Sequence, residues 1–445
     1  MSNKKEWYEE EFWIRTFTAS PGEIDPDDYV ICIYYVVPKK GMSLQGAAIN
    51  LAAEESIGTW TKVVTMTNKV LKLAGKVFKI EKLNSGGLVK VAFPLDLFDL
   101  DAGISHLLSI IAGNLFGLGD LKGVRLLDLH LPKEYAKMFK GPKFGIEGVR
   151  KLIGTDREPR PHLGTIIKPK VGLGPKETAK VAYEAAIGGV DFIKDDETLT
   201  SQKFNPLEDR VSSVMEALDK VKEETGRRIL YAVDVTADLN RLWKNVETAL
   251  DNGANCIMVD VLCVGFPALR NLAEDPSVKV PIHVHRCMHA AMTRNSEHGI
   301  HMLVLAKLVR LAGGDQLHTG TAKGKMEKPG AGAPRQLENY SGVRGIRYIN
   351  DFLRSEWYNL RTVMPVASGG IHPALIPDNL KLLGYPDIQI NAGGGIHGHP
   401  KGTRAGAMAM RQAIEAFIKG VPLEEYAKAH SELREALNYW GVKFL

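Results

Sequence analysis

A short segment at residues 193–197 brings an amine and carboxylates together and carries the strongest chemical signal in the chain. It contains Lys194, Asp196 and Glu197, and it ends an apolar run that we expect to form a buried strand. Alternate side chains of a strand share a face, so Lys194 and Asp196 should point the same way, with Glu197 beside them where the strand ends. Carboxylate oxygens are hard ligands that suit Mg²⁺. The segment therefore indicates a candidate magnesium site.

Lys194 itself allows two interpretations. As an ammonium ion it would pair with the carboxylates, which is the commoner outcome for a cluster of this kind. As a neutral amine it would react with CO₂ to form a carbamate, which adds a further anionic oxygen ligand, and a lysine in the mouth of a barrel loses its proton more easily than one in water. The segment alone leaves both interpretations open.

Lysines and histidines recur at other predicted strand ends. Lys168 and Lys170 leave an apolar run at alternate positions, so we expect them to point into a pocket rather than to form a solvated basic edge. His283 and His285, also at alternate positions, are a possible zinc pair. Arg286 beside them suits an anion better than a second cation.

A rival interpretation is a metal-dependent hydrolase in which a carbamylated lysine bridges two metals. Barrels of that kind are similar to this chain in parts. They carry the histidine pair on the first strand, however, where this chain has Lys168 and Lys170.

A loop with glycines and lysines follows His318, the end of another predicted strand. It spans residues 319–327 and contains Lys323 and Lys325. Glycines beside charged residues are consistent with a mobile lid, and solvated loop lysines explain the same residues equally well.

Glycine clusters at 369–370 and 393–395 follow two further predicted strands. Glycines let backbone amides approach an anion closely, whereas tight turns alone would also use them. Two clusters at neighbouring strand ends favour a phosphate site, and Arg286 with His318 would hold a second phosphate. Together with the metal site, this arrangement suits a bisphosphorylated sugar whose carbonyl a metal polarises for enediol chemistry.

The elements that must position these residues alternate between strands and helices. The predicted strands are 162–170, 190–195, 229–236, 256–262, 280–286, 316–319, 363–367 and 388–391. Helix start and stop signals lie between them. For example, Pro206 starts a segment with apolar residues on one face, and Gly226 ends it. Eight such units predict an α/β fold, a TIM (β/α)8 barrel whose active site lies at the C-terminal ends of its strands. Residues 424–440 would add a C-terminal helix.

Residues 1–140 predict a separate α+β (ferredoxin-like) domain. The expected strands are 29–37, 62–66 and 88–93, and the expected helices are 42–55, capped by Ser43, and 104–115. Residues 141–154 would connect this domain to the barrel, so the domains are placed at 1–140 and 141–445.

Composition excludes several classes of protein. A formal charge of +5 over 445 residues does not indicate a nucleic-acid partner. No signal peptide or membrane-length apolar run is apparent. The cysteines have no paired spacing, so we expect buried free thiols in a reducing cytoplasm; they are Cys32, Cys256, Cys263 and Cys287.

In this arrangement the chain resembles the large subunit of ribulose-1,5-bisphosphate carboxylase/oxygenase (rubisco), most closely the archaeal form III enzymes. The segments that carry the resemblance are 54–60, 113–117, 164–170, 189–197, 283–289 and 368–370. It implies carboxylation and oxygenation of ribulose 1,5-bisphosphate through a Mg²⁺-bound enediolate. With CO₂ the products would be two molecules of 3-phosphoglycerate, in a role such as nucleotide salvage.

The resemblance also implies roles for individual residues. Lys194 would carry the activating CO₂ as a carbamate and bind Mg²⁺ with Asp196 and Glu197. The implied catalytic residues are Glu54, Lys168, Lys170, Lys194, His285 and Lys325. The implied substrate-binding residues are Thr59, Trp60, Asn114, Arg286, His289, His318, Ser368, Gly369, Gly370, Gly393 and Gly394.

Glu54 and Asn114 would come from a neighbouring subunit, so the resemblance implies a homodimer or an assembly of dimers, with no small subunit. Met326 departs from the leucine that many members carry beside the loop lysine, which bears on lid order and on CO₂/O₂ discrimination. The alternative is a rubisco-like enolase or isomerase of a related sugar phosphate. A non-catalytic scaffold would not need so many polar strand ends.

Overall fold

The computed structural model describes residues 11–59, 63–328, 330 and 333–441, which form two compact units. The N-terminal unit takes the described residues up to Phe139 together with those within 289–308 and 329–342. The barrel unit takes those within 140–288, 309–328 and 343–445. No helix within the described ranges is long and apolar enough to cross a membrane.

A five-stranded sheet forms the centre of the N-terminal unit, in the order β10-β4-β1-β3-β2. Its strands are β1 (Tyr29–Pro38), β2 (Lys76–Leu83), β3 (Gly86–Pro94), β4 (Leu121–His130) and β10 (Gly299–Ile300). The central strand β1 pairs antiparallel with both β3 and β4, and β10 joins β4 in parallel. The unit is therefore completed by residues that follow most of the barrel strands in the sequence.

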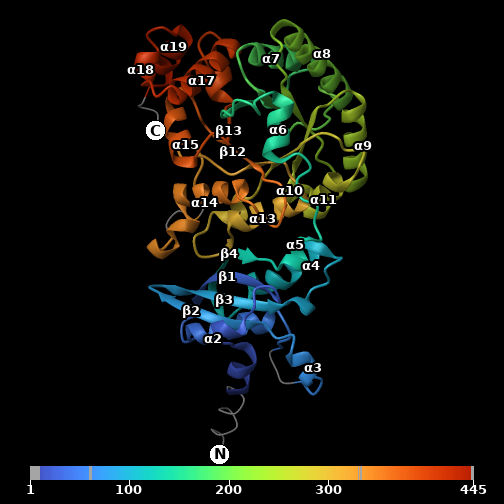
Figure 1. Cartoon of the computed structure of the whole chain (residues 1–445), viewed down its shortest axis with the longest axis vertical. Helices are drawn as coiled ribbons and strands as arrows, with labels where there is room; N and C mark the ends of the chain where they lie inside the picture. Colours follow the sequence, from blue (N-terminus) through green and yellow to red (C-terminus); the bar gives the residue numbers. More distant parts are fainter. Residues whose placement is uncertain (1–10, 60–62, 329, 331–332, 442–445) are drawn as a thin grey trace, which may run out of the picture. The chain divides into compact units, whose positions relative to one another are not determined.

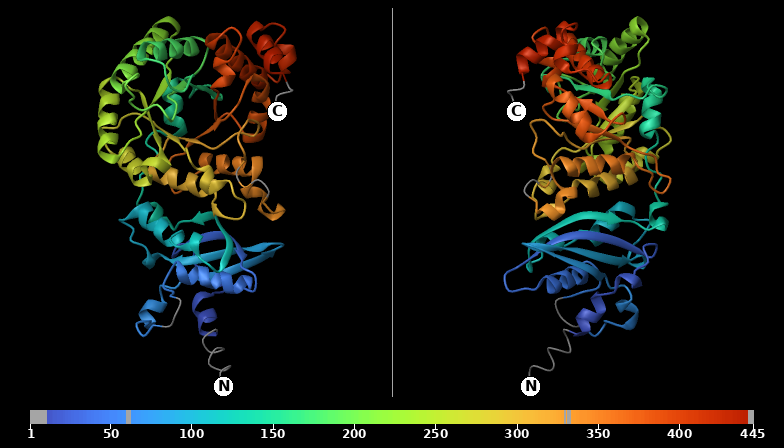
Figure 2. Two further views of the ribbon diagram at one scale, coloured as in Figure 1. Left: turned by 180° about the vertical axis from the view of Figure 1, so that it is seen from behind. Right: turned by 60° about the vertical axis from the view of Figure 1, so that its left-hand side comes forward.

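Helix α2 (Leu44–Glu54) covers one face of this sheet (Figure 2). The Ser43 side chain accepts a hydrogen bond from the Gly46 amide and so caps the helix, as predicted. The other helices and turns of the unit are α3 (Asn68–Leu71), α4 (Gly103–Ile111), α5 (Lys133–Ala136), α12 (Ala290–Thr293), η1 (Pro21–Glu23), η2 (Leu95–Leu97), η3 (Leu115–Gly117) and η4 (Arg335–Tyr340).

Eight parallel strands close into a barrel in the second unit, which confirms the predicted TIM barrel. In chain order they are β5 (His162–Ile166), β6 (Phe192–Lys194), β7 (Leu230–Asp234), β8 (Cys256–Asp260), β9 (Ile282–His285), β11 (Gln316–His318), β12 (Met364–Ser368) and β13 (Gln389–Asn391). Each lies within or next to a predicted segment, and their hydrogen-bonded cores are shorter than the apolar runs.

Helices surround the barrel on its outside (Figure 1). The helices and turns of the barrel unit, including short ones at the strand ends, are α6 (Gly145–Ile153), α7 (Pro175–Ile187), α8 (Leu207–Thr225), α9 (Leu239–Asp251), α10 (Val261–Val264), α11 (Phe266–Glu274), α14 (Gly342–Arg354), α15 (Ile376–Leu383), α16 (Gly394–His397), α17 (Thr403–Ile418), α18 (Leu423–Tyr426) and α19 (Ser431–Trp440), with η5 (Pro373–Leu375), among the described residues. Helix α13 (Met302–Ala312) contributes residues to both units.

Helix α8 illustrates how the sequence sets these boundaries. Pro206 is its N-cap, and Gly226 ends it with a φ of 72°, a left-handed conformation that suits glycine. The predicted apolar face is buried at Val211, Val214 and Leu218. That face packs the helix onto its neighbours and leaves its charged face in solvent.

Some sequence predictions are wrong. Residues 63–66 form a turn rather than the predicted strand 62–66, and residue 62 lies outside the described residues. Strands β2 and β4 were not predicted, and the supposed connection 141–154 contains helix α6. The single helix expected at 424–440 is divided into α18 and α19.

Candidate active site at the carboxyl ends of the barrel strands

Strand β6 ends in a row of side chains that alternate between two environments. The Asp195 carboxylate accepts hydrogen bonds from Tyr231 Oη at 2.6 Å, Arg210 Nε at 3.2 Å and the Asp234 amide at 3.0 Å. Asp195 therefore anchors the strand end inside the protein. Lys194 and Asp196, one position to either side, bind a different set of partners, as the strand alternation predicts.

Lys194 is fully buried, and its amine has short polar contacts. Its Nζ lies 2.6 Å from the Asp195 carbonyl oxygen and 3.5 Å from Glu197 Oε2. Lys168 Nζ donates to Asp196 Oδ2 at 2.7 Å. Burial alone would raise the pKa of Glu197, but the charges of Lys194 and His285 lower it to about 2. The predicted amine–carboxylate cluster is present, and the Glu197 carboxylate is ionised at neutral pH.

This donor set fits Mg²⁺ with a carbamate on Lys194. Asp196 and Glu197 supply hard carboxylate oxygens, and Lys194 lies on the same strand end within reach of Glu197. As an ammonium, Lys194 competes for those oxygens. Addition of CO₂ would turn it from a cation into an anionic oxygen ligand, which removes that competition.

The end of strand β9 adds imidazoles to the site. His285 Nδ1 lies 2.6 Å from Asp260 Oδ1, and its Nε2 lies 3.7 Å from Glu197 Oε2. Behind it, His283 Nε2 lies 2.8 Å from His318 Nε2, and both rings are buried. Burial and neighbouring positive charges hold the pKa values of His283 and His318 well below the ordinary range, so both rings are neutral.

Arg286 has the features of an anion ligand. Its Nη1 is buried and has no hydrogen-bond partner, and burial lowers its pKa to about 9. The guanidinium lies against Gly320, where a Cβ would come within 3.1 Å of Nη2. A buried unsatisfied cation is costly, so a bound phosphate oxygen would supply the missing partner.

The loop that carries Lys325 lies against the end of strand β12. The Lys325 amide donates to the Gly369 carbonyl at 3.0 Å, and the Lys325 side chain passes Gly370, where a Cβ would come within 2.8 Å of its Cγ. Lys325 and Met326 are both exposed in this position. The structure therefore brings the predicted lid to the glycine cluster 369–370.

Glycines next to Lys168 complete this part of the site. A Cβ on Gly393 would lie 2.9 Å from Lys168 Cε, so a larger residue there would require the flexible end of the Lys168 side chain to move. Gly394 starts α16 and is exposed, with no neighbouring atom within 4 Å of a built Cβ. Lys170 is exposed, and Ser368 is half-buried at the end of β12.

The remaining predicted residues belong to the N-terminal unit. Asn114 Nδ2 donates to Glu54 Oε1 at 3.3 Å, so these two exposed side chains lie together. Thr59 is half-buried, and Trp60 lies outside the described residues. His289 also falls in this unit, where its Nδ1 lies 2.8 Å from Thr293 Oγ1.

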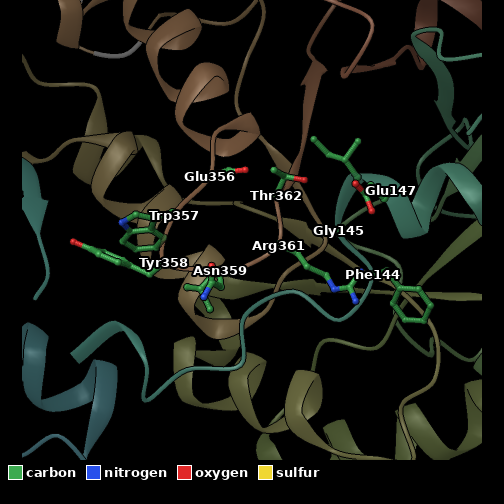
Figure 3. Close-up of a pocket in the computed structure, with 11 residues that line it drawn as sticks. Phe144, Gly145, Glu147, Glu356, Trp357, Tyr358, Asn359, Arg361 and Thr362 are labelled. Carbon is green, nitrogen blue, oxygen red and sulfur yellow. The ribbon is translucent and has the colours of Figure 1, made fainter. Parts of the chain in front are cut away.

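A separate pocket of about 400 Å³ holds none of the predicted residues. Its lining comes from segments 144–147 and 356–362 (Figure 3). The Phe144 amide donates to Asp315, which directly precedes β11, and Thr362 lies just before β12, so the pocket is at the amino end of the barrel. In a TIM barrel the chemistry belongs to the opposite end. The pocket is therefore not the candidate active site.

Two protein-family models match the sequence of this chain and together cover both units. Residues 22–135 match the ribulose bisphosphate carboxylase large chain, N-terminal domain, and residues 145–440 match the catalytic domain of the same chain. The chain belongs to the ribulose bisphosphate carboxylase large-chain family. The resemblance stated from the sequence is confirmed.

Archaeal members of this family are among the similar curated and solved proteins. The ribulose bisphosphate carboxylase of Methanocaldococcus jannaschii is 48% identical over 409 residues, covering 90% of this chain and 95% of the relative. Octameric rubisco from Pyrococcus horikoshii OT3 has a TM-score of 0.87 at 43% identity, covering 97% of this chain and 99% of that one. A dimeric archaeal rubisco from Hyperthermus butylicus has a TM-score of 0.84 at 38% identity, covering 96% and 99%.

Two acidic residues that contact candidate site residues or their neighbours were not predicted from the sequence. Asp260 orients His285, and the signal that identified Lys194, a charged residue at the end of a barrel strand, also marks Asp260. Glu55 is buried and accepts a hydrogen bond from the Gly113 amide at 2.9 Å, next to Asn114. Its neighbour Glu54 was identified from the family motif. The two glutamates are adjacent in the sequence, which did not indicate that Glu55 is buried and Glu54 exposed.

Proposed function

We propose that this chain carboxylates ribulose 1,5-bisphosphate at the carboxyl ends of its barrel strands. The observation that carries the proposal is the fully buried Lys194 beside Glu197, at a strand end within a chain of the ribulose bisphosphate carboxylase family. A buried lysine facing carboxylates has no structural need that an apolar residue would not meet better. Its burial at this position supports a chemical role.

Carbamylated Lys194, Asp196 and Glu197 would hold Mg²⁺. The metal, when bound, polarises the substrate carbonyl and so lowers the barrier to enolisation. Lys194, once carbamylated, would accept the proton from C3. Lys168, held by its contact with Asp196, would deliver protons at C2, and Lys170 would support the metal site.

Two residue groups would bind the phosphates at opposite sides of the mouth. Arg286 and His318 would hold one phosphate, and the unsatisfied Arg286 Nη1 supports that assignment. Ser368 would contact a sugar hydroxyl. The other phosphate would bind Thr59, Trp60, Gly369, Gly370, Gly393 and Gly394.

His285 and Lys325 would act after enolisation. His285, oriented by Asp260, would assist the hydrated intermediate. Lys325 would place an ammonium ion next to CO₂ as negative charge develops on it, and closing of its loop would exclude water. His289 would contact the substrate or support the residues that do.

The functional unit would be a homodimer or an assembly of dimers without a small subunit. Residues 1–140 would act as a domain that lends Glu54 and Asn114 to the neighbouring subunit, and residues 141–445 would form the catalytic domain. Oxygenation with O₂, a cytoplasmic location and a role in nucleotide salvage remain predictions of the family resemblance.

The test is product formation from ribulose bisphosphate, Mg²⁺ and labelled bicarbonate. A carboxylase converts the label into 3-phosphoglycerate in step with substrate loss, whereas an enolase or isomerase consumes the sugar without fixing label. Lys194→Met should be folded and inactive, and Lys279→Met, which alters an exposed lysine of the barrel unit, should be fully active. Substrate loss without labelled product would reject the proposal.

A further inference from the structure

Two of the four cysteines lie together beside the candidate active site, which corrects the prediction of four buried thiols. Cys263 is exposed, Cys287 is half-buried, and their sulfur atoms are 3.4 Å apart. Cys32 and Cys256 are fully buried. The pair was not predicted from the sequence, because 24 residues separate its members.

Strand ends of the barrel create this pair. Cys263 lies on α10, directly after β8, and Cys287 follows the end of β9. Strands β8 and β9 are hydrogen-bonded neighbours, with Asp260 paired to His285. Cys263 follows Asp260 by three positions and Cys287 follows His285 by two, so both cysteines lie just beyond paired strand ends at the barrel mouth.

Asp260 connects the sulfur pair to the catalytic groups. One ligand atom from each of Asp260, Cys263 and Cys287 lies within 4.8 Å of the others. The Cys287 thiol is hydrogen-bonded to the Asp260 carboxylate, whose Oδ1 also faces His285 Nδ1 at 2.6 Å. Burial, together with the charge of Asp260, raises the pKa of Cys287 to about 12, so this thiol is protonated.

We propose that Cys263 and Cys287 are a modification site, a dithiol that small-molecule disulfides convert reversibly into an intramolecular disulfide. The sulfur atoms must approach by about 1.4 Å to reach the bond length of about 2.0 Å. Because α10 is a single short turn with one exposed cysteine, the movement involves the loop and not the barrel strands.

The reaction proceeds by two thiol–disulfide exchanges. The exposed Cys263, as a thiolate, attacks a small-molecule disulfide, forms a mixed disulfide and releases one small thiol. Cys287 then attacks Cys263 Sγ, its proton passes to the Asp260 carboxylate, and the second small thiol leaves. In total, two protein thiols are oxidised to one disulfide, and one small disulfide is reduced to two thiols.

Oxidation alters the surroundings of His285. The bond removes the thiol proton that Cys287 donates to Asp260, and it pulls on a residue two positions after His285. A displacement of about 1 Å at a catalytic group can cost roughly a hundredfold in rate. We expect the oxidised protein to lose at least about tenfold of its carboxylation rate and to recover it on reduction.

The first experiment is peptide mapping and does not depend on activity. The whole protein is incubated with oxidised glutathione, denatured, alkylated and digested. The expected product is a Cys263–Cys287 linked peptide that dithiothreitol separates, with Cys32 and Cys256 alkylated as internal controls. Free thiols at both positions, a glutathione adduct on Cys263 that persists, or a link between chains would each overturn the proposal.

The second experiment measures carboxylation before and after oxidation, and this arm rests on the proposed function. The wild-type rate should fall and return with dithiothreitol, whereas Cys263→Ser should keep its rate because it cannot form the bond. Cys287→Ser also cannot form the bond and retains a hydroxyl donor for Asp260, so its rate should likewise not change on oxidation. An unchanged rate in protein shown to carry the disulfide would refute the coupling to His285, while an inactive reduced wild type would instead contradict the carboxylase assignment.

Discussion

At the scale of single residues, a buried charged side chain with a full set of hydrogen-bond partners stabilises the fold, whereas one that lacks a partner indicates a ligand site. The Asp195 carboxylate is fully satisfied by the partners that fix the end of β6, and its role is structural. Arg286 differs, because its Nη1 is buried without a partner. A residue that costs stability without a ligand is expected at a binding site.

We therefore predict opposite effects of Arg286→Met on binding and on stability. The KM for ribulose bisphosphate should rise about tenfold to a hundredfold, because a charge-assisted hydrogen bond contributes about 1.5–3 kcal/mol. The melting temperature without ligand should not fall, because an uncompensated charge has been removed. Inorganic phosphate should raise the melting temperature of the wild type and not that of the variant. Equal stabilisation of both proteins by phosphate would contradict the assignment.

Glu55 predicts a pH dependence of stability in the N-terminal unit. Burial raises the pKa of Glu55 from about 4.5 to about 7. Between these values the folded carboxyl holds a proton that the unfolded one has lost, so the free energy of unfolding should fall as pH rises from about 4.5 to about 7. The contribution is on the order of 3 kcal/mol.

Glu55→Gln should remove this part of the pH profile. The amide is neutral throughout and can still accept from the Gly113 amide. Urea unfolding at about pH 5 and about pH 8 measures the free energy of unfolding of both proteins. Any excess of the wild-type value over the variant value at about pH 5 should become smaller, or change sign, at about pH 8. Glu81→Gln, which changes an exposed carboxylate of the same unit, is the matched control. Parallel profiles for wild type and Glu55→Gln would show that Glu55 does not titrate in this range.

At the scale of elements, the loop that carries Lys325 depends on a close backbone contact. A Cβ on Gly324 would lie 2.3 Å from the Gly369 carbonyl oxygen, so alanine cannot occupy this position without moving the loop. Gly324→Ala should lower carboxylation by about tenfold or more, while C3 proton exchange with solvent continues because Lys325 supplies no group for enolisation. Gly119→Ala, whose Cβ meets no atom within 4 Å, should behave as wild type.

Lys325→Ala tests the side chain that this loop delivers. Loss of one preorganised donor costs about 3 kcal/mol, so carboxylation should fall about a hundredfold or more with exchange retained. Both rates are measured on one carbamylated preparation. Carboxylation near the wild-type rate would remove Lys325 from the mechanism, and loss of exchange would move its role to binding or enolisation.

The elements that sequence predicted best are those whose burial does not depend on distant partners. The barrel strands are apolar runs buried on both faces, and such runs are recognisable alone. Strand β4 was missed because its charges are paired by distant residues: Asp128 lies 2.5 Å from Lys307, and Arg125 Nη2 donates to the Thr293 carbonyl. Strand β2 was missed because half of it is exposed and rich in lysine.

The same distinction applies to the candidate site. Lys194, Asp196 and Glu197 are adjacent in sequence, so their common location followed from strand alternation. The contacts between Asp260 and His285 and between Cys263 and Cys287 depend on which strands are neighbours in the closed barrel. The residue types at the strand ends were enough to predict the kind of chemistry. Predicting which of these residues contact each other also required the order and register of the barrel strands.

At the scale of the whole molecule, the predicted active site requires residues from two units. Lys194 belongs to the barrel unit, whereas Glu54 and Asn114 lie together in the N-terminal unit. The relatives from Pyrococcus horikoshii and Hyperthermus butylicus are described as octameric and dimeric. In an assembly of this kind, each barrel would have access to the N-terminal unit of another chain.

Complementation between two inactive chains tests this arrangement. Glu54→Gln and Lys194→Met should each be inactive, since either change spoils every site of its own homodimer. In a mixed dimer, one site combines the unaltered barrel of the first chain with the unaltered N-terminal unit of the second. Random exchange in an equal mixture should restore about a quarter of wild-type carboxylation, since about half of the dimers are mixed and one of their two sites is intact.

Subunit exchange must be established independently, for which chains of different mass and native mass spectrometry are suitable. If each site were built within one chain, the mixed dimers would contain one spoiled residue at every site, and activity would stay absent however complete the exchange. Adding the double variant Glu54→Gln/Lys194→Met to wild type gives the matched control. In its mixed dimers the shared arrangement spoils both sites, because each site takes one altered residue from the double variant. A self-contained arrangement would leave the wild-type site intact, so the loss of activity on mixing distinguishes the two architectures a second time.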